Sequence, residues 1–471
     1  MSARPDEAAP QVSPTQFNGF VSKEAQELFE SRYWTKSYPP GVSGDMPPLR
    51  YTSMLELVAE CLKKYADRPA FVSAGTEFSY KQVDDMSDQF AGYLKSIGVK
   101  AGDVVAIMLP NCVQFPVCFV GAMKLGCTLT NVNPLYTVRE LNHQLKDSGA
   151  TTIVVFENFA NTLQQSLEGT KVKNIVITQL GDLLGGLKGL IVNFVMRKIK
   201  KMVPAYNLPQ AVPIKKALAA GRGVAFPKPN PQLDDVALLQ YTGGTTGVSK
   251  GAMLTQRNLM SNMEQGLAWM SEAIGKEPIC VVTMLPLYHI YALAVNCMLF
   301  MTFGARNILI ANPRDVGTVM KVLRKEKFHV ITAVNTLFNG LANHPDFNKV
   351  DWSHLKVAVG GGTAVQSGVA KLWFDKTGCP ICEGYGLSET SPTVSCNPIT
   401  STEFTGTIGV PLPSTYMKLL DDEGVEVAQG QSGEIAIKGP QVMAGYWQRP
   451  DETAKVMTPD GYFKTGDIGV V

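Results

Sequence analysis

A run of glycines, hydroxyl-bearing residues and one lysine is the part of this sequence best suited to chemistry. It reads YTGGTTGVSKGA from Tyr241 to Ala252, after an apolar segment and before a helical pattern. Glycine lets backbone N–H groups approach an anion closely, the hydroxyls add hydrogen-bond donors, and Lys250 supplies a positive charge. We therefore predict a loop that binds a polyphosphate.

Two other interpretations of this loop are weaker. A Walker A loop places lysine directly after its last glycine and serine or threonine directly after the lysine. Here two residues separate Gly247 from Lys250, and Gly251 follows the lysine. A flexible loop without a ligand is the second alternative, and the backbone entropy that so many glycines lose on folding disfavours it.

The segment resembles the signature loop of the adenylate-forming superfamily, which includes acyl-CoA synthetases, luciferases and the adenylation domains of peptide synthetases. Further motifs of that superfamily follow in the expected order: PLYH at 286–289, GGG at 360–362, EGYGLSET at 383–390 and YFKTGD at 462–467. The resemblance covers nearly all of the chain after about residue 50. Within the superfamily, the segments at 131–150, 312–316 and 438–453 resemble bacterial long-chain fatty-acid-CoA ligases.

The resemblance implies a reaction in two steps. A carboxylate attacks the α-phosphate of ATP and expels pyrophosphate, and the thiol of CoA then attacks the mixed anhydride. Such chemistry is catalysed mainly by positioning and by electrostatic stabilisation, so the site needs donors, a cation and Mg²⁺ rather than a protein nucleophile.

The resemblance also assigns roles to individual residues. The loop from Thr242 to Lys250 would hold the β- and γ-phosphates, Thr242 and Glu389 would lie close to Mg²⁺, Tyr385 would stack on adenine, and Asp467 would accept the ribose hydroxyls. Taken singly, Glu389 and Tyr385 are also compatible with a surface carboxylate and a packing residue. The implied catalytic residues are Lys250, His289, Thr245 and Glu389. The implied nucleotide-binding residues are Tyr241, Thr242, Gly243, Gly244, Thr245, Thr246, Gly247, Val248, Ser249, Lys250, Gly251, Ala252, Gly362, Glu383, Gly384, Tyr385, Gly386, Ser388 and Asp467.

His289 stands at the start of the longest apolar stretch. A histidine satisfied within the core and a histidine that donates a hydrogen bond to the acyl carboxylate are equally consistent with this position. The apolar segments 290–300 and 331–338 are candidate walls of an acyl tunnel, although apolar helices are core by default. Some long-chain members are described as having an aromatic gate four residues after this histidine, where this chain has Leu293.

Alternating helical patterns and short apolar runs must position these residues. The pattern predicts an α/β fold, with two layered αβα subdomains and a small distorted β-barrel. We expect an N-terminal extension at 1–48, a first α/β subdomain at 49–235, a second one with the nucleotide and acyl sites at 236–406, and the barrel at 407–471. The sequence ends within an apolar run, from which we expect a small C-terminal domain to be absent.

Composition excludes several classes of protein. Apolar residues make up 45% of the 471 residues and the formal net charge is +2, which fits a globular protein and gives no reason to expect nucleic acid as a partner. Nine scattered cysteines indicate a reducing cytosol, and Cys379 and Cys382 lack the second ligand pair of a zinc site. The polar N-terminus does not resemble an export signal.

A basic, apolar segment at 187–202 could lie on an anionic membrane surface, and a plain surface helix is an equally weighted alternative. We favour peripheral contact with the inner face of the cytoplasmic membrane, and we also allow for a homodimer. The expected function is ATP-dependent, AMP-forming activation of long-chain fatty acids to acyl-CoA, with little or no turnover by this chain alone. The alternatives are an acyl-AMP ligase that loads a carrier protein and a non-catalytic, membrane-associated fatty-acid-binding protein.

Overall fold

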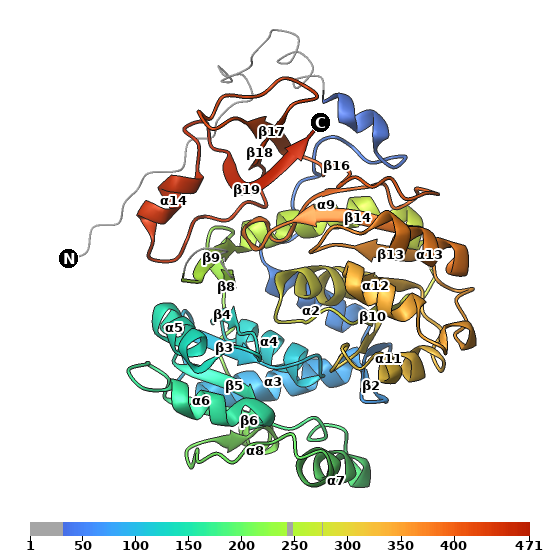
Figure 1. Cartoon of the computed structure of the whole chain (residues 1–471). Helices are drawn as coiled ribbons and strands as arrows, with labels where there is room; N and C mark the ends of the chain where they lie inside the picture. The colour runs from blue at the N-terminus through green and yellow to red at the C-terminus, as the bar shows by residue number, and fades with distance from the viewer. Residues whose placement is uncertain (1–31, 243–247, 276) are drawn as a thin grey trace, which may run out of the picture.

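The computed structural model describes residues 32–242, 248–275 and 277–471. In these residues the strands form three sheets, and helices cover the two larger ones (Figure 1). Strands β3, β5 and β6 are short apolar runs with almost every residue buried, as expected for parallel strands that are covered on both faces. The α/β class and the layered arrangement predicted from the sequence are confirmed.

The first sheet has, among the described residues, the strand order β7-β6-β5-β3-β4-β8-β9. All neighbouring strands are parallel except β8 and β9, which are antiparallel. The strands are β3 (Val104–Met108), β4 (Thr128–Asn131), β5 (Thr152–Phe156), β6 (Asn174–Thr178), β7 (Val212–Pro213), β8 (Val236–Thr242) and β9 (Lys250–Thr255).

The second sheet has the described order β16-β15-β14-β13-β12-β10-β11-β1-β2. Its central strands are parallel, and β2, β15 and β16 are antiparallel to their neighbours. The strands are β1 (Pro69–Ser73), β2 (Thr76–Ser79), β10 (Cys280–Thr283), β11 (Arg306–Leu309), β12 (Val330–Ala333), β13 (Val357–Gly360), β14 (Ile381–Gly386), β15 (Thr393–Cys396) and β16 (Val410–Pro411).

The two large sheets exchange strands across the boundary expected at residue 235. Strands β1 and β2 come from the first expected subdomain but belong to the second sheet, whereas β8 and β9 follow residue 235 and belong to the first sheet. The sequence pattern marks where strands begin and end, but it does not show which sheet each strand joins. As a division into domains, the boundary at 235 stays a prediction.

The C-terminal region, expected as a distorted barrel, forms a three-stranded antiparallel sheet among the described residues, with β18 in the centre. Its strands are β17 (Tyr416–Leu420), β18 (Ser432–Lys438) and β19 (Phe463–Val470). This sheet lies at one end of the molecule, beyond β9 and β14 (Figure 1). Residues 438–463 connect β18 to β19 and include helix α14 (Pro450–Val456).

The helices and helical turns cover the faces of the sheets and supply the buried contacts between them. They are η1 (Tyr33–Ser37), α2 (Met54–Lys64), α3 (Tyr80–Ser96), α4 (Gln114–Lys124), α5 (Val138–Ser148), η2 (Glu157–Phe159), α6 (Ala160–Ser166), α7 (Gly186–Phe194), η3 (Val195–Ile199), α8 (Ile214–Gly221), α9 (Gln256–Ile274), η4 (Ala292–Leu299), α10 (Phe300–Thr302), α11 (Val316–Leu323), α12 (Asn335–Ala342), η5 (Phe347–Lys349), α13 (Ser367–Thr377) and η6 (Ser388–Thr390). Within the described ranges, no helix is both long enough and apolar enough to cross a bilayer.

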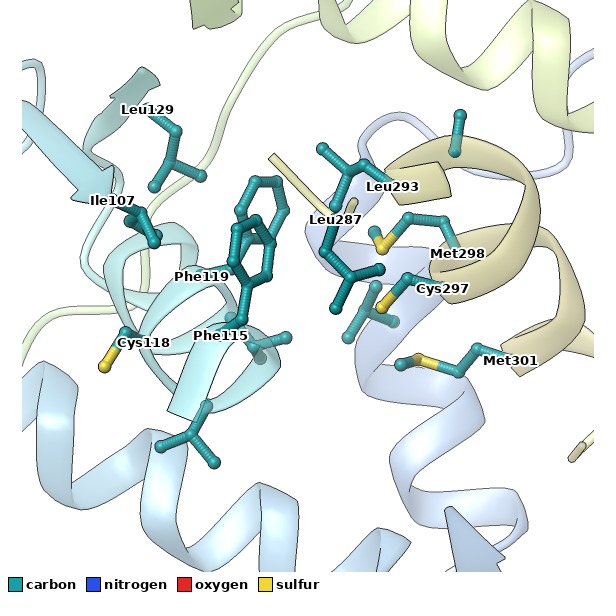
Figure 2. Packing of buried hydrophobic residues seen from close by; sticks show 14 of the residues in the cluster. Ile107, Phe115, Cys118, Phe119, Leu129, Leu287, Leu293, Cys297, Met298 and Met301 are labelled. Atoms are coloured by element: carbon teal, nitrogen blue, oxygen red, sulfur yellow. The ribbon is translucent and has the colours of Figure 1, made fainter. Parts of the chain in front are cut away.

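The largest apolar core joins the two large sheets. Figure 2 shows Phe115 and Phe119 of α4 on one side of this core, and Leu293 and Met298 of η4 on the other. These side chains are almost fully buried. The apolar stretch that begins at Ile290 is therefore a buried helical segment, as the sequence analysis predicted.

Candidate active site

The predicted phosphate loop connects the antiparallel strands β8 and β9, and Thr242 is paired with Lys250 at the base of this hairpin. Strand β9 therefore lies between the loop and helix α9, whereas the sequence pattern predicted a helix directly after the loop. Helix α9 begins after Thr255, whose side chain accepts a hydrogen bond from the backbone of Asn258. The candidate residues Gly243, Gly244, Thr245, Thr246 and Gly247 lie outside the described residues.

Side-chain contacts fix both strands of the hairpin. The Tyr241 hydroxyl donates to Oδ2 of Asp147 over 2.6 Å, and Arg449 contacts Oδ1 of the same carboxylate at 3.1 Å. Gly251 lies against the Tyr241 ring, because a Cβ there would be 3.0 Å from ring atoms. The Ser249 carbonyl is 2.8 Å from Nε2 of His143. The structure thus gives Tyr241 a structural partner that the sequence analysis did not foresee.

Lys250 is the cation of this hairpin, and it already has two partners. Its Nζ lies 3.0 Å from Oε2 of Glu452 and 4.6 Å from the centroid of the Tyr446 ring. Contacts with Lys455 and Lys250 lower the pKa of Glu452 to about 2. Because Glu452 is on a surface helix and partly accessible, this ion pair contributes little to stability, and a competing anion can displace it.

Glu389 lies in the turn η6, which packs against β8 and β9. Its side chain is buried, and burial raises the pKa of its carboxyl group. The Tyr446 hydroxyl donates to Oε1 over 2.8 Å, a contact that favours the ionised form. Lys250 also favours ionisation electrostatically, whereas Asp467 opposes it, so all three groups lie within electrostatic reach of one another.

The segment from Met443 to Arg449 holds these elements together. The Met443 N–H donates to the carbonyl of Glu389 over 2.7 Å, and the Trp447 N–H donates to the carbonyl of Gly251 over 2.8 Å. In the sequence this segment is marked only by its resemblance to ligase segments, which implies no role for Tyr446 or Glu452. The GYW motif near Arg449 was the only feature of the sequence that could have drawn attention to Tyr446. The contacts of Tyr446 with Glu389 and Lys250 can be seen only in the folded chain.

Tyr385 and Asp467 come from different sheets and meet through their side chains. The Tyr385 hydroxyl donates to Oδ2 of Asp467 over 2.7 Å, and burial raises the pKa of Tyr385. Asp467 is exposed on β19, directly after Gly466, which adopts a φ of 80° and donates its N–H to Glu434 over 2.9 Å. This contact brings together two of the residues that the resemblance placed around the nucleoside.

The other candidates in the 383–390 motif have different surroundings. Glu383 is buried and accepts a hydrogen bond from the Val365 backbone over 2.7 Å, and burial raises its pKa. Gly386 closely approaches the residue that precedes strand β15, because a Cβ there would lie 1.9 Å from the Pro392 carbonyl oxygen. Ser388 begins the turn that carries Glu389. Gly386 lines the cavity beside Tyr385, whereas Glu383 fixes the backbone at Val365.

A cavity of about 750 Å³, including its open mouth, lies beside Tyr385. His289, Gly362, Gly384 and Gly386 line it together with apolar side chains. Gly361 also lines it, and a Cβ there would be 2.9 Å from the Tyr291 ring. His289 and Tyr385 are polar lining residues, and the remaining side chains that line the cavity are mostly apolar: Trp269, Met270, Tyr291, Val295, Leu299, Val359, Leu387, Pro392, Cys396, Ile399 and Leu412.

His289 is accessible at this cavity, although the surrounding protein lowers its pKa through desolvation. Its Nδ1 accepts a hydrogen bond from the Tyr291 N–H over 3.2 Å. A neutral ring with this contact carries its proton on Nε2. His289 is therefore suited to donate a hydrogen bond near neutral pH, and it is not a histidine enclosed within the core.

Only part of the expected acyl wall lines this cavity. Tyr291, Val295 and Leu299 face it, whereas the segment 331–338 does not line it and contributes to a separate apolar core. Leu293 lies on another face of η4 and lines a second cavity of about 1420 Å³, including its open part. The position of the expected gate is therefore turned away from the cavity that contains His289.

The cysteines show no sign of a metal site. Cys379 and Cys382 are buried, and Cys382 lies 3.9 Å from Cys396, sulfur to sulfur. Among the residues that the structure describes, no group of three or more histidines, cysteines or acidic residues could hold a metal ion. Cys379, just before β14, and Cys382, on β14, pack in two different apolar clusters.

Residues 58–447 match the family of AMP-binding enzymes, and the chain belongs to this family. The long-chain-fatty-acid–CoA ligase of Salmonella typhimurium is 48% identical over 443 residues, which cover 93% of this chain and 78% of that protein. The ligase of the same name from Haemophilus influenzae is 44% identical over 444 residues, covering 93% of this chain and 79% of that protein.

Solved structures share the fold. A long-chain-fatty-acid-CoA ligase from Archaeoglobus fulgidus matches with a TM-score of 0.76 and 24% identity, over 92% of this chain and 84% of that chain. An anthranilate CoA ligase, solved with anthranoyl-AMP, matches with a TM-score of 0.76 and 19% identity, over 90% of this chain and 76% of that chain. These likenesses support the fold of the two layered sheets.

Proposed function

We propose that this chain activates long-chain fatty acids with ATP: the carboxylate displaces pyrophosphate to form an acyl-adenylate, and the thiol of CoA then displaces AMP to form acyl-CoA. The observation that carries the proposal is the convergence of two sets of groups at Tyr385. On one side, Tyr385 contacts Asp467 and lies beside the turn of Glu389. On the other side, it lines the largely apolar cavity that His289 also lines.

The charged residues suit the nucleotide in this proposal. Lys250 would leave Glu452 and contact phosphate oxygens, and Asp467 would accept the ribose hydroxyls while Tyr385 lies against the base. Glu389 is a hard oxygen ligand beside the hairpin, and with Thr242 it would hold Mg²⁺, which would neutralise phosphate charge when bound. The residues present therefore fit a magnesium nucleotide.

The neutral His289 would position the fatty-acid carboxylate. Its Nε2 proton can be donated to one carboxylate oxygen, which orients the other oxygen toward the α-phosphate. The apolar part of the cavity would take the beginning of the acyl chain and exclude water from the reacting groups. This assignment gives His289 a positioning role and leaves the carboxylate as the nucleophile.

The 443 residues aligned with the Salmonella relative cover 78% of that protein. We propose that this chain binds ATP and a fatty acid at the site described above. Contact with the cytoplasmic face of the membrane and a homodimer remain parts of the proposal.

Calorimetry with MgATP, and a fatty-acid-dependent assay of pyrophosphate release with and without CoA, test the proposed function. We expect ATP to bind. Lys250→Met should weaken its binding by at least tenfold, which corresponds to about 1.4 kcal/mol, because the variant lacks the positive charge proposed to contact the phosphates. Fatty-acid binding without any ATP binding would instead support a lipid carrier. Adenylate formation without thioester formation in the presence of CoA would support transfer to another acceptor.

A further inference from the structure

Helix α7 and the turn η3 are attached to the body of the protein through small and polar groups. Gly189 approaches Gly181 so closely that a Cβ on Gly189 would lie 2.3 Å from the Gly181 carbonyl oxygen. Asn193 accepts a hydrogen bond from the Gly181 N–H over 2.7 Å and donates to Asp182 over 3.0 Å. The face of α7 turned toward the protein is therefore attached mainly by Gly189 and Asn193, and Val192 packs against the largest apolar core.

A buried carboxylate fixes the end of this helical segment. Arg197 binds both oxygens of Glu157, with Nε 2.9 Å from Oε2, and the Tyr206 hydroxyl donates to Oε1 over 2.7 Å. The side chain of Glu157 is only 3% exposed. Arg197 is thus a structural partner of Glu157, and it is not one of the freely available cations that the sequence suggested.

The apolar side chains of the same segment point to solvent. Large apolar residues recur with helical spacing on this outer face, and each keeps between about two-fifths and three-quarters of its surface accessible: Leu187 71%, Leu190 63%, Ile191 52%, Phe194 59%, Ile199 65% and Met202 43%. An ordinary surface helix buries its apolar stripe and exposes its polar one. In this segment the large apolar side chains are on the exposed face instead, so that face is suited to contact an apolar environment.

Basic residues accompany this apolar face. Lys198, Lys200 and Lys201 are exposed and make no direct ion pair among the residues that the structure describes, although Lys200 acts electrostatically on Asp315. Lys188 donates to Thr76 over 2.8 Å. Residues 187–202 contain no acidic side chain. Exposed apolar groups beside several cations are complementary to a surface that combines acyl chains with anionic headgroups.

We propose that the outer face of residues 187–202 docks on an anionic lipid bilayer, with Leu187, Leu190, Ile191 and Phe194 inserted at the interface and Lys198, Lys200 and Lys201 at the headgroups. The segment lies at the end of the molecule opposite the C-terminal sheet (Figure 1). Docking there leaves Asp467 on the side away from the lipid. This surface is independent of the residues proposed to bind nucleotide.

Vesicle sedimentation tests the proposal with two variants of the whole chain. Phosphatidylcholine vesicles, with and without phosphatidylglycerol, serve as the probe. The double variant Leu190→Ser with Phe194→Ser should abolish binding to both kinds of vesicle. Lys198→Gln with Lys200→Gln and Lys201→Gln should weaken binding to the anionic vesicles by roughly 100-fold, since each lysine near such a surface contributes about 1 kcal/mol. Added salt should reproduce the loss in the wild-type chain.

Matched controls separate docking from general changes in charge or stability. Lys171→Gln with Lys215→Gln and Lys216→Gln removes the same charge from exposed positions elsewhere, and Leu135→Ser with Val425→Ser removes exposed apolar groups elsewhere. Both controls should bind vesicles like the wild type. A Phe194→Trp variant gives a direct readout. The emission of its tryptophan should shift to the blue when anionic vesicles are added, and it should stay unchanged in buffer without vesicles.

The outcomes that would overturn the proposal are distinct. Unchanged vesicle binding in both test variants would reject the site. If the serine variant abolished a dimer seen by light scattering while vesicle binding stayed unchanged, the face would be an interface between two copies of the chain. ATP binding should be the same in all these variants, so a failure here is distinguishable from a failure of the proposed ligase function.

Discussion

The hydroxyl of Tyr446 donates a hydrogen bond to Glu389 over 2.8 Å. The ring of the same tyrosine lies 4.6 Å from Nζ of Lys250. One aromatic side chain from the connection between β18 and β19 therefore contacts both the carboxylate and the cation of the candidate nucleotide site. A hydrogen bond stabilises the ionised carboxylate, and the face of the ring stabilises the ammonium group.

Tyr446→Phe should separate these two contacts, because it removes the hydroxyl and keeps the ring. Without the hydrogen bond, which favours the ionised form, the already raised pKa of Glu389 should rise further. The ionised carboxylate is the form that binds a cation, so Mg²⁺-dependent activity should fall as pH decreases through this pKa. The acidic limb of the pH profile should therefore move to higher pH in the variant.

A pH series of pyrophosphate release at several Mg²⁺ concentrations measures this shift. Tyr136→Phe is a suitable control, since Tyr136 is a half-buried tyrosine outside this network. Coincident acidic limbs for Tyr446→Phe and the wild type would show that the hydrogen bond does not tune Glu389.

Glu452→Gln should tighten ATP binding by severalfold. The ion pair with Glu452 occupies Lys250 in the structure, and its removal leaves the ammonium group available to phosphate. Because the pair is exposed to solvent, the thermal midpoint should change little. Calorimetry gives the affinity, and Glu423→Gln, at an exposed position in another loop, is the matched control. A weaker affinity in Glu452→Gln would mean that Glu452 orients Lys250 rather than competing for it.

Asp467→Ala should remove discrimination between ATP and an analogue without ribose hydroxyls. If the carboxylate accepts those hydroxyls, 2′,3′-dideoxy-ATP should bind the wild type at least tenfold more weakly than ATP, with both nucleotides equally weak in the variant. Tyr385→Phe, which loses the 2.7 Å contact with Asp467 but keeps the ring, should show an intermediate ratio. An undiminished ratio in Asp467→Ala would assign ribose recognition to another residue.

A graded series at Val295 should change the preferred length of the fatty acid. Val295 lines the cavity that contains His289, so Val295→Phe should lower kcat/KM for long acids more than for short ones, and Val295→Ala should have the opposite effect. Assays across acids of increasing length give the profile. Leu293→Phe is the counterpart in the second cavity. If Leu293→Phe changed the length profile and the substitutions at Val295 did not, the acyl chain would be assigned to the second cavity instead.

Local sequence determined a large part of this fold. Apolar runs bounded by Gly, Asp or Pro predicted strands such as β3, β5, β6, β12 and β13, because a buried strand needs little more than a short apolar segment with turn residues at its ends. The loop between β8 and β9 was found from its composition, and the family followed from ordered motifs. These features depend on neighbouring residues, so the sequence alone displays them.

Contacts between distant segments were decided only by the tertiary structure. Tyr446 meets Glu389 across 57 positions of sequence, and Tyr385 meets Asp467 across 82. The exchange of strands between the sheets likewise depends on packing that periodicity does not encode. On α7 the sequence showed basic and apolar residues together, but only the fold revealed that Arg197 is bound to the buried Glu157 while the apolar side chains face outward. Which face of a helix is buried depends on what packs against it, and that information lies elsewhere in the chain.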